Sequence, residues 1–291
     1  MRLRLRPFER LHYNEQRCKC WDGSREAKVL LALDIGNTAI TIGVFDGEKI
    51  RARWSIATDV ENLVDEYAIL LLNLLQTDGL GASDIDEAVM GSVVPSLTPV
   101  FEEVCSRYFK VSALVVDPGV RTGIRILYDS PRDVGADRVI DAVAAIKLYG
   151  PPLIIVDFGT ATVFDAISRE GDYVGGAIAP GIGISVEALF GRTAKLPRIE
   201  LERPKHAIGK TTVNAMQSGV IFGYVGLVEG IITRMKAELE GEAKVIATGG
   251  YAPLIARETP VIEEVNLDLT LVGLRLIQEG NRQASSGRQG R

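Results

Sequence analysis

Cysteine and histidine are scarce in this 291-residue sequence, which contains three of the former and two of the latter. An odd and sparse set of cysteines does not build a disulfide framework, and this favours a reducing compartment. Cys18 and Cys20 lie close together, but no second cysteine or histidine pair follows at the spacing of a zinc site. His12 and His206 stand alone, so a zinc protein is not expected.

Long apolar runs and an excess of positive charge are also missing. The longest apolar stretches are interrupted by Asp or Gly before they reach the roughly 18 residues of a membrane span. Residues 1–28 contain no continuous apolar segment of the secretory type. The formal net charge of −5 provides no basic field, so neither nucleic acid nor a membrane is an expected partner. We therefore expect a cytoplasmic protein with a small-molecule substrate.

The composition that is present is that of a globular protein. Hydrophobic residues make up 46% of the chain and charged residues 24%, enough for a substantial core over two domains. Regular apolar patterning begins only near Val29. We interpret 1–28 as a disordered extension and 281–291, rich in Ser, Gly and Arg, as a disordered tail. The two domains are then predicted at 29–148 and 149–280.

Two Asp-x-Gly hairpins recur at a fixed interval. A buried-type strand from Val29 ends at a polar tip, and the strand that follows the tip alternates apolar and polar residues. The second copy lies 123 residues further along, with Asp157 for Asp34, Gly159 for Gly36 and Ile167 for Val44. Such an interval favours two similar domains, each with three meandering strands followed by helices and further strands.

The remaining pattern completes an α/β fold in both halves. Helical spacing predicts helices over 61–76, 96–109, 135–149, 181–190, 212–240 and 270–279. Apolar runs predict strands over 88–94, 113–116 and 244–248. We therefore predict two similar α/β domains with a cleft between them, an order of strands and helices that resembles the ribonuclease-H-like domains of the actin-like ATPases.

The hairpin tips carry residues that suit phosphate. In the first tip, Gly36 lets the backbone approach an anion, and Asn37 and Thr38 add side-chain donors. Asp34 beside a polyphosphate makes sense when Mg²⁺ lies between them. An ordinary Asx turn uses the same residue types, so the first tip alone leaves both interpretations open. The matching tip at 157–162 favours a polyphosphate held from both sides of a cleft.

A third tip follows the strand at 245–248, where a Gly pair lets the backbone approach a flat base or a ribose. A plain strand-to-helix turn explains this pair equally well in isolation. Three tips in this order, however, match the actin-like arrangement of phosphate, phosphate and adenosine. There is no Gly-Lys-Ser/Thr loop of the Walker type, which excludes a P-loop kinase.

Asp137 and Arg138 are adjacent at an expected helix start. A kinase that acts on a primary alcohol needs a carboxylate to accept the hydroxyl proton and a cation to hold an acidic substrate. Taken by itself, however, the pair is better explained by a helix cap at Asp137 and a solvated surface charge at Arg138.

Over about 29–280 the sequence resembles the type III pantothenate kinases. The resemblance rests on LALDIGNT, DVGADR, VDFGTAT, GGAIAPGI, the TAKLP run and AIGKTT. It implies ATP-dependent phosphorylation of pantothenate to 4'-phosphopantothenate, the first step of coenzyme A biosynthesis. It also implies Mg²⁺ with the ATP, a monovalent cation, K⁺ or NH₄⁺, and a homodimer that binds pantothenate where the subunits meet.

The resemblance further implies roles for single residues. Asp137 matches the proton acceptor, and Asp157 matches the ligand of the monovalent cation. ATP-binding positions are Asp34, Ile35, Gly36, Asn37, Thr38, Ala39, Ile40, Thr41 and Thr160. Substrate-binding positions are Tyr128, Gly135, Ala136, Asp137, Arg138 and Thr212. Loop packing is the alternative for Tyr128, and the N-cap of the next helix is the alternative for Thr212.

Two other functions keep the same fold. A kinase for another small hydroxy acid or a sugar would retain both tips, although nothing here offers the extra substrate domain or zinc cluster that some of those carry. A non-catalytic nucleotide-binding regulator would be expected to lack the base, and Asp137 is present.

One predicted helix has an unusual composition. Gly219, Gly223 and Gly226 follow at spacings of four and three, so this helix can approach another backbone closely. Packing inside the chain is an equal alternative.

Overall fold

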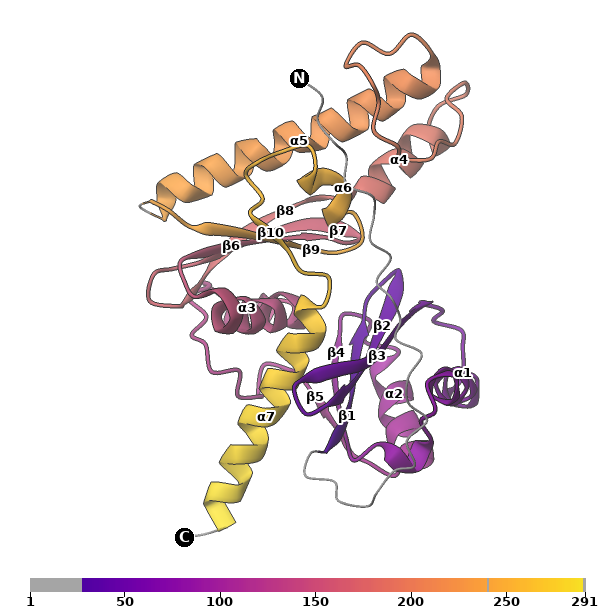
Figure 1. Cartoon of the computed structure of the whole chain (residues 1–291), viewed down its shortest axis with the longest axis vertical. Coiled ribbons are helices and arrows are strands. Elements are labelled where there is room, and N and C mark those ends of the chain that lie inside the picture. The colour runs from indigo at the N-terminus through magenta and orange to yellow at the C-terminus, as the bar shows by residue number, and fades with distance from the viewer. Residues whose placement is uncertain (1–27, 240, 290–291) are drawn as a thin grey trace, which may run out of the picture.

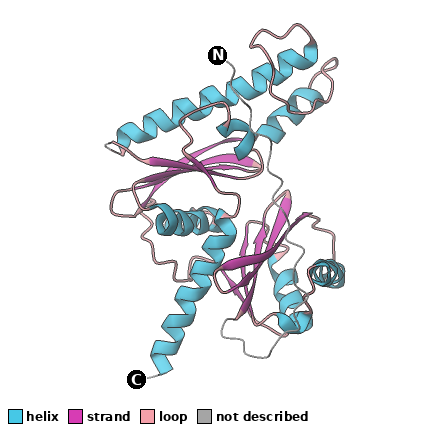
Figure 2. Ribbon diagram, viewed as in Figure 1, coloured by secondary structure: helices cyan, strands magenta, loops and turns pink. Residues whose placement is uncertain are grey.

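Two five-stranded sheets with flanking helices form the computed structural model, which describes residues 28–239 and 241–289 (Figures 1 and 2). The predicted extension lies, except for Lys28, outside the described residues. The first sheet has the order β3-β2-β1-β4-β5 and the second β10-β9-β6-β7-β8. The strands are β1 Val29–Ile35, β2 Ala39–Asp46, β3 Lys49–Ala57, β4 Glu87–Ser92, β5 Ala113–Val115, β6 Leu153–Phe158, β7 Ala161–Ile167, β8 Tyr173–Pro180, β9 Lys244–Thr248 and β10 Glu264–Val265.

The helices cover the outer and inner faces of the two sheets. They are α1 Val64–Thr77, α2 Thr98–Val104, α3 Ala136–Tyr149, α4 Ile182–Gly191, α5 Thr212–Glu238, α6 Ala252–Ala256 and α7 Leu269–Gln289. Short helical turns occupy Ala82–Asp84, Cys105–Phe109 and Pro131–Asp133. In both sheets three antiparallel strands are followed by a fourth that pairs parallel with the first. The prediction of two similar α/β domains is confirmed.

The repeat interval changes at the tips. Leu31 of β1 pairs with Val44, and Ile154, 123 residues later, pairs with Ala166. Beyond the tips the interval is therefore 122 residues, and Ala166 rather than Ile167 corresponds to Val44. The predicted correspondence was wrong there because the second tip is one residue shorter than the first.

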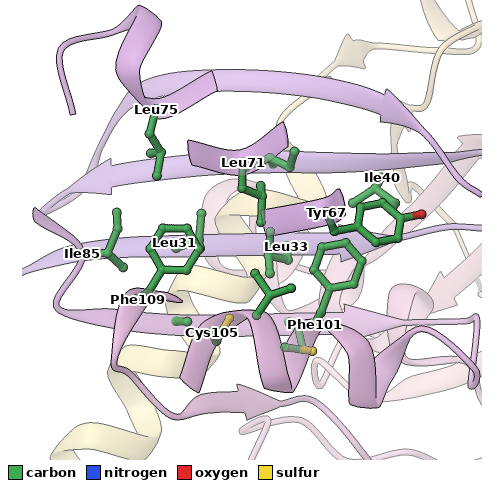
Figure 3. Close-up of a cluster of buried hydrophobic side chains, with 14 of the residues drawn as sticks. Leu31, Leu33, Ile40, Tyr67, Leu71, Leu75, Ile85, Phe101, Cys105 and Phe109 are labelled. Carbon is green, nitrogen blue, oxygen red and sulfur yellow. The ribbon is translucent and has the colours of Figure 1, made fainter. Parts of the chain in front are cut away.

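The first core lies between β1 and the helices α1 and α2. Leu31, Leu33 and Ile35 alternate with residues of the opposite face, as a strand period of two requires, and all three are buried. The rings of Tyr67 and Phe101 lie 4.7 Å apart between their centroids and close the cluster (Figure 3). The other face of β1 is also buried, so the strand reads as a continuous apolar run.

Helices α3 and α7 each pack on the sheet of the other half of the sequence. Helix α3 precedes the second sheet in sequence yet packs on it with Val139 and Ala142. Helix α7 follows the second sheet and packs on the first through Leu271 and Leu274 (Figure 1). The helices meet at Gly273, where an added Cβ would lie 2.2 Å from the Ile140 carbonyl oxygen. A boundary at residue 148 therefore separates the sheets but not the packing units.

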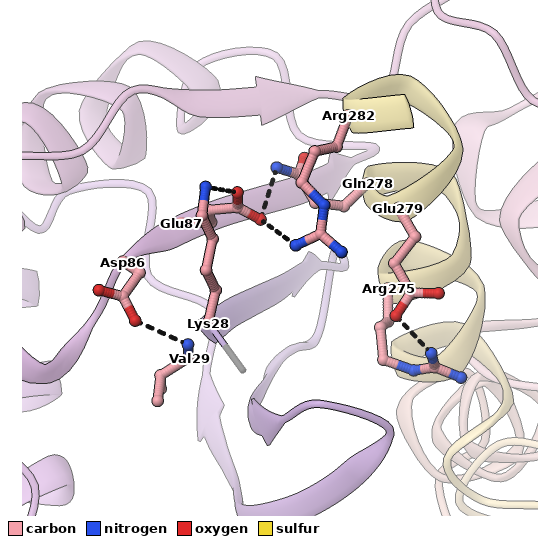
Figure 4. A network of polar contacts seen from close by, with 8 residues as sticks. All are labelled: Lys28, Val29, Asp86, Glu87, Arg275, Gln278, Glu279 and Arg282. Carbon is pink, nitrogen blue, oxygen red and sulfur yellow. Dashed lines mark hydrogen bonds and ion pairs between the residues drawn. The ribbon is translucent and has the colours of Figure 1, made fainter. Parts of the chain in front are cut away.

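Helix α7 is longer than predicted and continues to Gln289, into the segment that composition assigned to a disordered tail. Its second half is attached to the first domain. Glu87 at the start of β4 contacts Lys28 and Gln278 at 2.5 and 3.3 Å and Arg282 at 3.7 Å (Figure 4). The Asn281 amide donates to the Arg121 carbonyl at 2.9 Å. These tertiary contacts override the weak helix propensity of the sequence.

Helix α5 differs from the expectation of interrupted apolar runs. Among the described residues it is the one helix long and apolar enough to cross a membrane by length and composition. Its Val220, Val228 and Ile232 are buried against the second sheet. Helices that pack in a protein core pass the same test, so we attribute this composition to packing.

Candidate active site

The two hairpin tips meet across the space between the sheets. Gly36 turns the chain after β1 and donates its N–H to the Ala39 carbonyl at 3.1 Å. The hydroxyl oxygens of Thr38 and Thr160 lie 2.7 Å apart, so the tips of β1-β2 and β6-β7 touch. Asn37, Thr38 and Thr160 are exposed. The backbone and hydroxyl groups of both tips are thus available to a single ligand.

The other predicted ATP-binding residues contribute in different ways. Ile35 and Ile40 are fully buried in the first core. They can reach a nucleotide only through their backbone. Ala39 is exposed, and Thr41 is half-buried on β2 opposite Asp34.

Carboxylates from three elements converge below the tips. Asp34 and Asp157 are the second-last residues of β1 and β6, and Asp137 lies in the first turn of α3; all three are half-buried. Burial, then the charges of Asp137 and Asp157, raise the pKa of Asp34 to about 7. Burial, then the charges of Asp137 and Asp165, raise the pKa of Asp157 to about 7. The cluster therefore favours a bound cation, which would relieve this repulsion.

Asp137 is not the cap of its helix. Gly135 holds the N-cap position without a side-chain cap, and Asp137 Oδ1 accepts from the Arg138 N–H at 2.8 Å. An added Cβ at Gly135 would lie 2.5 Å from that oxygen, so a larger residue at position 135 would displace the Asp137 carboxylate. Ala136 between them is half-buried in the same turn. Burial raises the pKa of Asp137, and the neighbouring Arg138 acts in the opposite direction. A carboxylate tuned upward in a cleft suits a proton acceptor.

Arg138 is buried, which excludes the interpretation as a solvated surface charge. Its Nε and Nη2 lie 2.9 and 2.7 Å from Asp165 Oδ1. The Tyr173 hydroxyl donates to the same oxygen at 2.7 Å, and the guanidinium carbon lies 5.7 Å from the centre of the Tyr173 ring. The Tyr128 ring lies 6.4 Å from that of Tyr173, next to Gly175 of β8. Arg138 is thereby fixed beside Asp137, with Tyr128 at the edge of the same cluster.

Sequence reasoning missed Asp165, Tyr173 and Asp141. Asp165 and Asp141 interrupt the apolar runs of β7 and α3, and a charge inside a buried pattern was the available signal. Asp141 is 4% exposed, lies one helical turn after Asp137, and accepts from the Thr270 hydroxyl of α7 at 2.7 Å. Burial and the charge of Asp157 raise its pKa.

The third predicted tip adjoins the carboxylates. Gly249 has a positive φ of 88°, and an added Cβ would lie 2.4 Å from Asp157 Oδ1. On its other side, an added Cβ at Gly183 of α4 would lie 3.3 Å from the Tyr251 hydroxyl. The backbone after β9, the start of α4 and the second tip thus surround one region.

Thr212 is the predicted residue that the chain does not bring to the cluster. It is exposed in the first turn of α5, and among the described residues no hydrogen bond or ion pair joins it to Asp137, Arg138 or Tyr128. The N-cap of α5 is Thr211, whose hydroxyl accepts from the Asn214 N–H at 3.2 Å. The alternative that Thr212 caps the helix is therefore wrong.

Oxygen atoms are the ligands that this site offers to a metal. No group of three or more His, Cys, Asp and Glu side chains is arranged to hold a metal ion among residues 28–239 and 241–289. The carboxylates of Asp34 and Asp157 and the hydroxyl of Thr160 are hard donors of the kind that suit Mg²⁺ and K⁺. The donor set fits ions that keep part of their coordination for a ligand and water.

Comparison with known proteins assigns the chain to a family. A family model described as type III pantothenate kinase matches residues 30–234. The type III pantothenate kinase of Moorella thermoacetica is 52% identical over 253 residues, 87% of this chain and 100% of that protein. That of Geobacillus kaustophilus is 52% identical over 255 residues, 88% of this chain and 99% of that protein.

Solved structures support the fold alone. MreB 5 of Spiroplasma citri, bound to AMPPNP, has a TM-score of 0.54 at 10% identity and covers 90% of this chain and 99% of its own. The activator of 2-hydroxyisocaproyl-CoA dehydratase from Clostridium difficile, with bound ADPNP, has a TM-score of 0.52 at 14% identity and covers 89% of this chain and 97% of its own. The family match and the identities above lead to one conclusion: this chain belongs to the type III pantothenate kinase family.

Proposed function

We propose that this protein transfers the γ-phosphate of ATP to the primary hydroxyl of pantothenate and so forms 4'-phosphopantothenate, the first step of coenzyme A biosynthesis. The contact between the two tips carries the proposal. Thr38 and Thr160 lie 2.7 Å apart above the carboxylates, where a polyphosphate can be held from both sides. Family membership supplies the acceptor.

Each part of the site has a task in this reaction. The exposed tips donate backbone N–H and hydroxyl groups to the phosphates, which positions the γ-phosphorus. Asp137 accepts the hydroxyl proton of the acceptor as its oxygen attacks phosphorus in line. Asp165 and Tyr173 hold Arg138, whose guanidinium keeps further N–H donors for the carboxylate of pantothenate. Tyr128 packs its ring against that of Tyr173 and would contact pantothenate at the edge of the site.

Metal ions complete the charge balance. Mg²⁺ bound with ATP would neutralise charge on the transferring phosphoryl group. Asp34 would hold this ion or its water shell, and Asp157 would hold a monovalent cation, K⁺ or NH₄⁺. The repulsion that raises the pKa of both carboxyls to about 7 supports cation binding at this place.

A homodimer is part of the proposal, because Thr212 lies apart from its own chain's cluster. Large apolar side chains are exposed around the N-terminal end of α5 and on α4, at 46% for Phe190, 83% for Ile208 and 40% for Val213. On α5, a Cβ added at Gly219 or Gly223 would meet nothing within 4 Å, so these glycines are not packed inside the chain. This face suits a second copy, whose Thr212 would then join the pantothenate site of its partner.

Sizing by light scattering tests the dimer. Phe190→Glu is expected to give a monomer with a raised KM for pantothenate, whereas Ile69→Glu, at a similarly exposed residue of α1, should remain dimeric. A wild-type monomer with full activity would contradict this part of the proposal.

The cytoplasm is the proposed location, in keeping with the sparse cysteines.

Phosphoryl transfer itself is tested by coupled ADP release. The protein is assayed with Mg-ATP and K⁺, and with pantothenate, glucose, acetate or no acceptor. We expect release with pantothenate alone, and mass spectrometry should detect its phosphate ester. Release of ADP with glucose or acetate instead would favour a kinase for a sugar or another small acid. If the protein binds ATP but none of the acceptors causes release of ADP, a non-catalytic regulator is favoured.

A further inference from the structure

A large cavity lies beside the active site but outside it. Its volume is about 1050 Å³, and it opens between the carboxyl ends of β4 and β5, the segment 116–134, and the helices α3 and α7. Ala136 is the one residue assigned to the active site that lines it. Because Ala136 and Val139 lie on one helix face, and Asp137 and Asp141 on another, the first turns of α3 separate the cavity from the carboxylates.

The cavity wall is apolar with a cationic rim. Most of its lining consists of aliphatic side chains and prolines, among them Ile124, Val139 and Ile277. Arg121 and Arg132 also line it, and both are exposed. Neither guanidinium forms an ion pair with any residue that the structure describes. Asp117 is the single acidic residue of the lining, so the rim carries a net positive charge.

The rim is held in place by the fold. The Arg121 carbonyl accepts from the Asn281 amide of α7 at 2.9 Å. Further along the same segment, the Leu127 N–H donates to the Tyr173 carbonyl at 2.8 Å, and the Tyr173 N–H donates to the Arg125 carbonyl at 2.9 Å. The part of the segment from Arg121 to Leu127 is thus fixed to α7 at one end and to β8 at the other, and Arg132 follows five residues later in the short turn Pro131–Asp133.

We propose that this cavity binds an amphipathic anion, a ligand with an apolar body the size of a medium-length acyl chain and one carboxylate or phosphate head. Ligand pockets of proteins typically have about 300–1000 Å³ and combine an apolar lining with a few polar groups. The aliphatic wall takes the apolar body, and the two arginines at the rim take the head through charge-assisted hydrogen bonds.

The position of the cavity gives it a regulatory role. Its walls come from the first sheet and from α3 and α7, so a ligand bound there holds the first domain against both helices. The segment 116–134 also carries Tyr128 and leads directly into Gly135 and Asp137. A ligand in the cavity therefore changes the KM for pantothenate. This effect on KM rests on the proposed function, but the binding of the ligand does not.

Calorimetric titration of the full chain with octanoate and octyl phosphate tests the site without catalysis. We expect saturable binding of one molecule per chain for at least one of them. The ratio of the two dissociation constants shows whether the site prefers a carboxylate or a phosphate head. Acetate, which lacks the body, and octanol, which lacks the charge, should bind at least about tenfold more weakly. Absence of saturable binding of both amphiphiles would overturn the proposal.

Three variants locate the binding. Gly280 lines the cavity, and a Cβ added there meets nothing within 4 Å. Gly280→Leu should fill the cavity without strain and abolish binding, whereas Gly280→Ala should bind as the wild type does. Replacing Arg121 and Arg132 together by Ala should weaken binding by about tenfold or more. Arg169→Ala, at an exposed turn of the second domain, is the matched control.

Two results would place the ligand elsewhere. Binding that survives Gly280→Leu in a protein that melts normally would mean that octanoate does not enter this cavity. Displacement of octanoate by pantothenate with simple competition in every variant would mean that it occupies the substrate site. Either result would contradict the inference, while a failure of pantothenate phosphorylation alone would leave it intact.

Discussion

Gly43 of β2 and Asp165 of β7 occupy equivalent positions, because their partners on β1 and β6 are 123 residues apart. Over Gly43 packs Leu271, the third residue of α7, and an added Cβ at Gly43 would lie 2.9 Å from its Cδ1. Over Asp165 lies Arg138, the third residue of α3, in a buried ion pair. The two domains thus fill the same place in one fold with an apolar contact and with a charged one.

The two contacts differ in what they require and in what they can do beyond stabilising the fold. An apolar contact stabilises a domain without further requirements, whereas a buried ion pair is weak evidence of stability and needs every partner in place. In the second domain this pair fixes Arg138 beside Asp137. The residue before Leu271 is Thr270, whose hydroxyl donates to Asp141 rather than facing a substrate. In the proposed mechanism, the contact in the first domain serves packing alone, and the contact in the second domain also positions a substrate-binding residue.

The largest expected effect comes from breaking the charged contact. Asp165→Ala leaves the Arg138 guanidinium buried without its partner, and such changes cost about 3–5 kcal/mol of unfolding free energy. In a chain of this size we expect a fall in Tm of about 6–20 °C, together with a raised KM for pantothenate. Thermal unfolding followed by circular dichroism measures the first effect, and an unchanged Tm would show that the pair contributes nothing.

The double variant Arg138→Leu/Asp165→Ala sharpens this comparison. It gives the second domain an apolar contact like that of the first, so part of the lost stability should return, although the buried Tyr173 hydroxyl still lacks its acceptor. Pantothenate binding should not return, because the guanidinium is gone. Recovered binding in the double variant would remove Arg138 from the substrate site.

The close contact between α3 and α7 is tested by a substitution at Gly273. Gly273→Ala places a Cβ 2.2 Å from the Ile140 carbonyl oxygen, so α7 must move away from α3. Overpacking of this kind typically costs about 1–3 kcal/mol. Gly280→Ala on the same helix has open space and should instead stabilise by up to about 1 kcal/mol through helix propensity. Equal urea midpoints for the two variants would contradict the close crossing.

The third prediction concerns pH. The pKa of Asp157 is raised from 3.8 to about 7, so the folded protein binds this proton more tightly than the unfolded chain does. The resulting stabilisation is present below about pH 4 and is lost as the pH rises through about 7. Without nucleotide or K⁺, Asp157→Asn should therefore exceed the wild type in stability at pH 8, by about 1–2 kcal/mol after allowance for solvent access.

The same variant should lose its response to K⁺. The Tm of the wild type should rise when K⁺ is added at pH 8, because a cation relieves the repulsion among the carboxylates, and the Tm of Asp157→Asn should not. A stability difference that is the same at pH 5 and pH 8 would show that Asp157 titrates normally.

The smallest expected effect is at the contact between the tips. Thr38→Val removes an exposed hydrogen bond to Thr160, which is worth at most about 0.5 kcal/mol, so the Tm should hardly change. The KM for ATP should rise several-fold, because a donor to the phosphates is lost. Thr77→Val, at another exposed hydroxyl far along α1, serves as the control. An unchanged KM for ATP in Thr38→Val would show that the Thr38 hydroxyl does not contribute to nucleotide binding.

The repeat of the tips was predictable because Asp34 and Asp157 follow apolar strands and precede glycines, a local pattern with a local cause. Sequence gave no access to the exchange of α3 and α7, because the helical period of 136–149 identifies an apolar face but not the sheet that covers it. Asp165 was missed for the same reason. Its partner Arg138 is 27 residues away in the chain, and only the folded sheet brings the two together.

We propose that proton transfer depends on Asp137, whereas its counterpart Thr270 stabilises the fold. The most direct measurement is kcat at saturating pantothenate and Mg-ATP for Asp137→Asn and Thr270→Val, with a melting curve for each. We expect a loss of kcat of about 10²–10⁴-fold for Asp137→Asn with a normal Tm, and a lowered Tm with little loss of kcat for Thr270→Val. Wild-type turnover in a folded Asp137→Asn protein would contradict it.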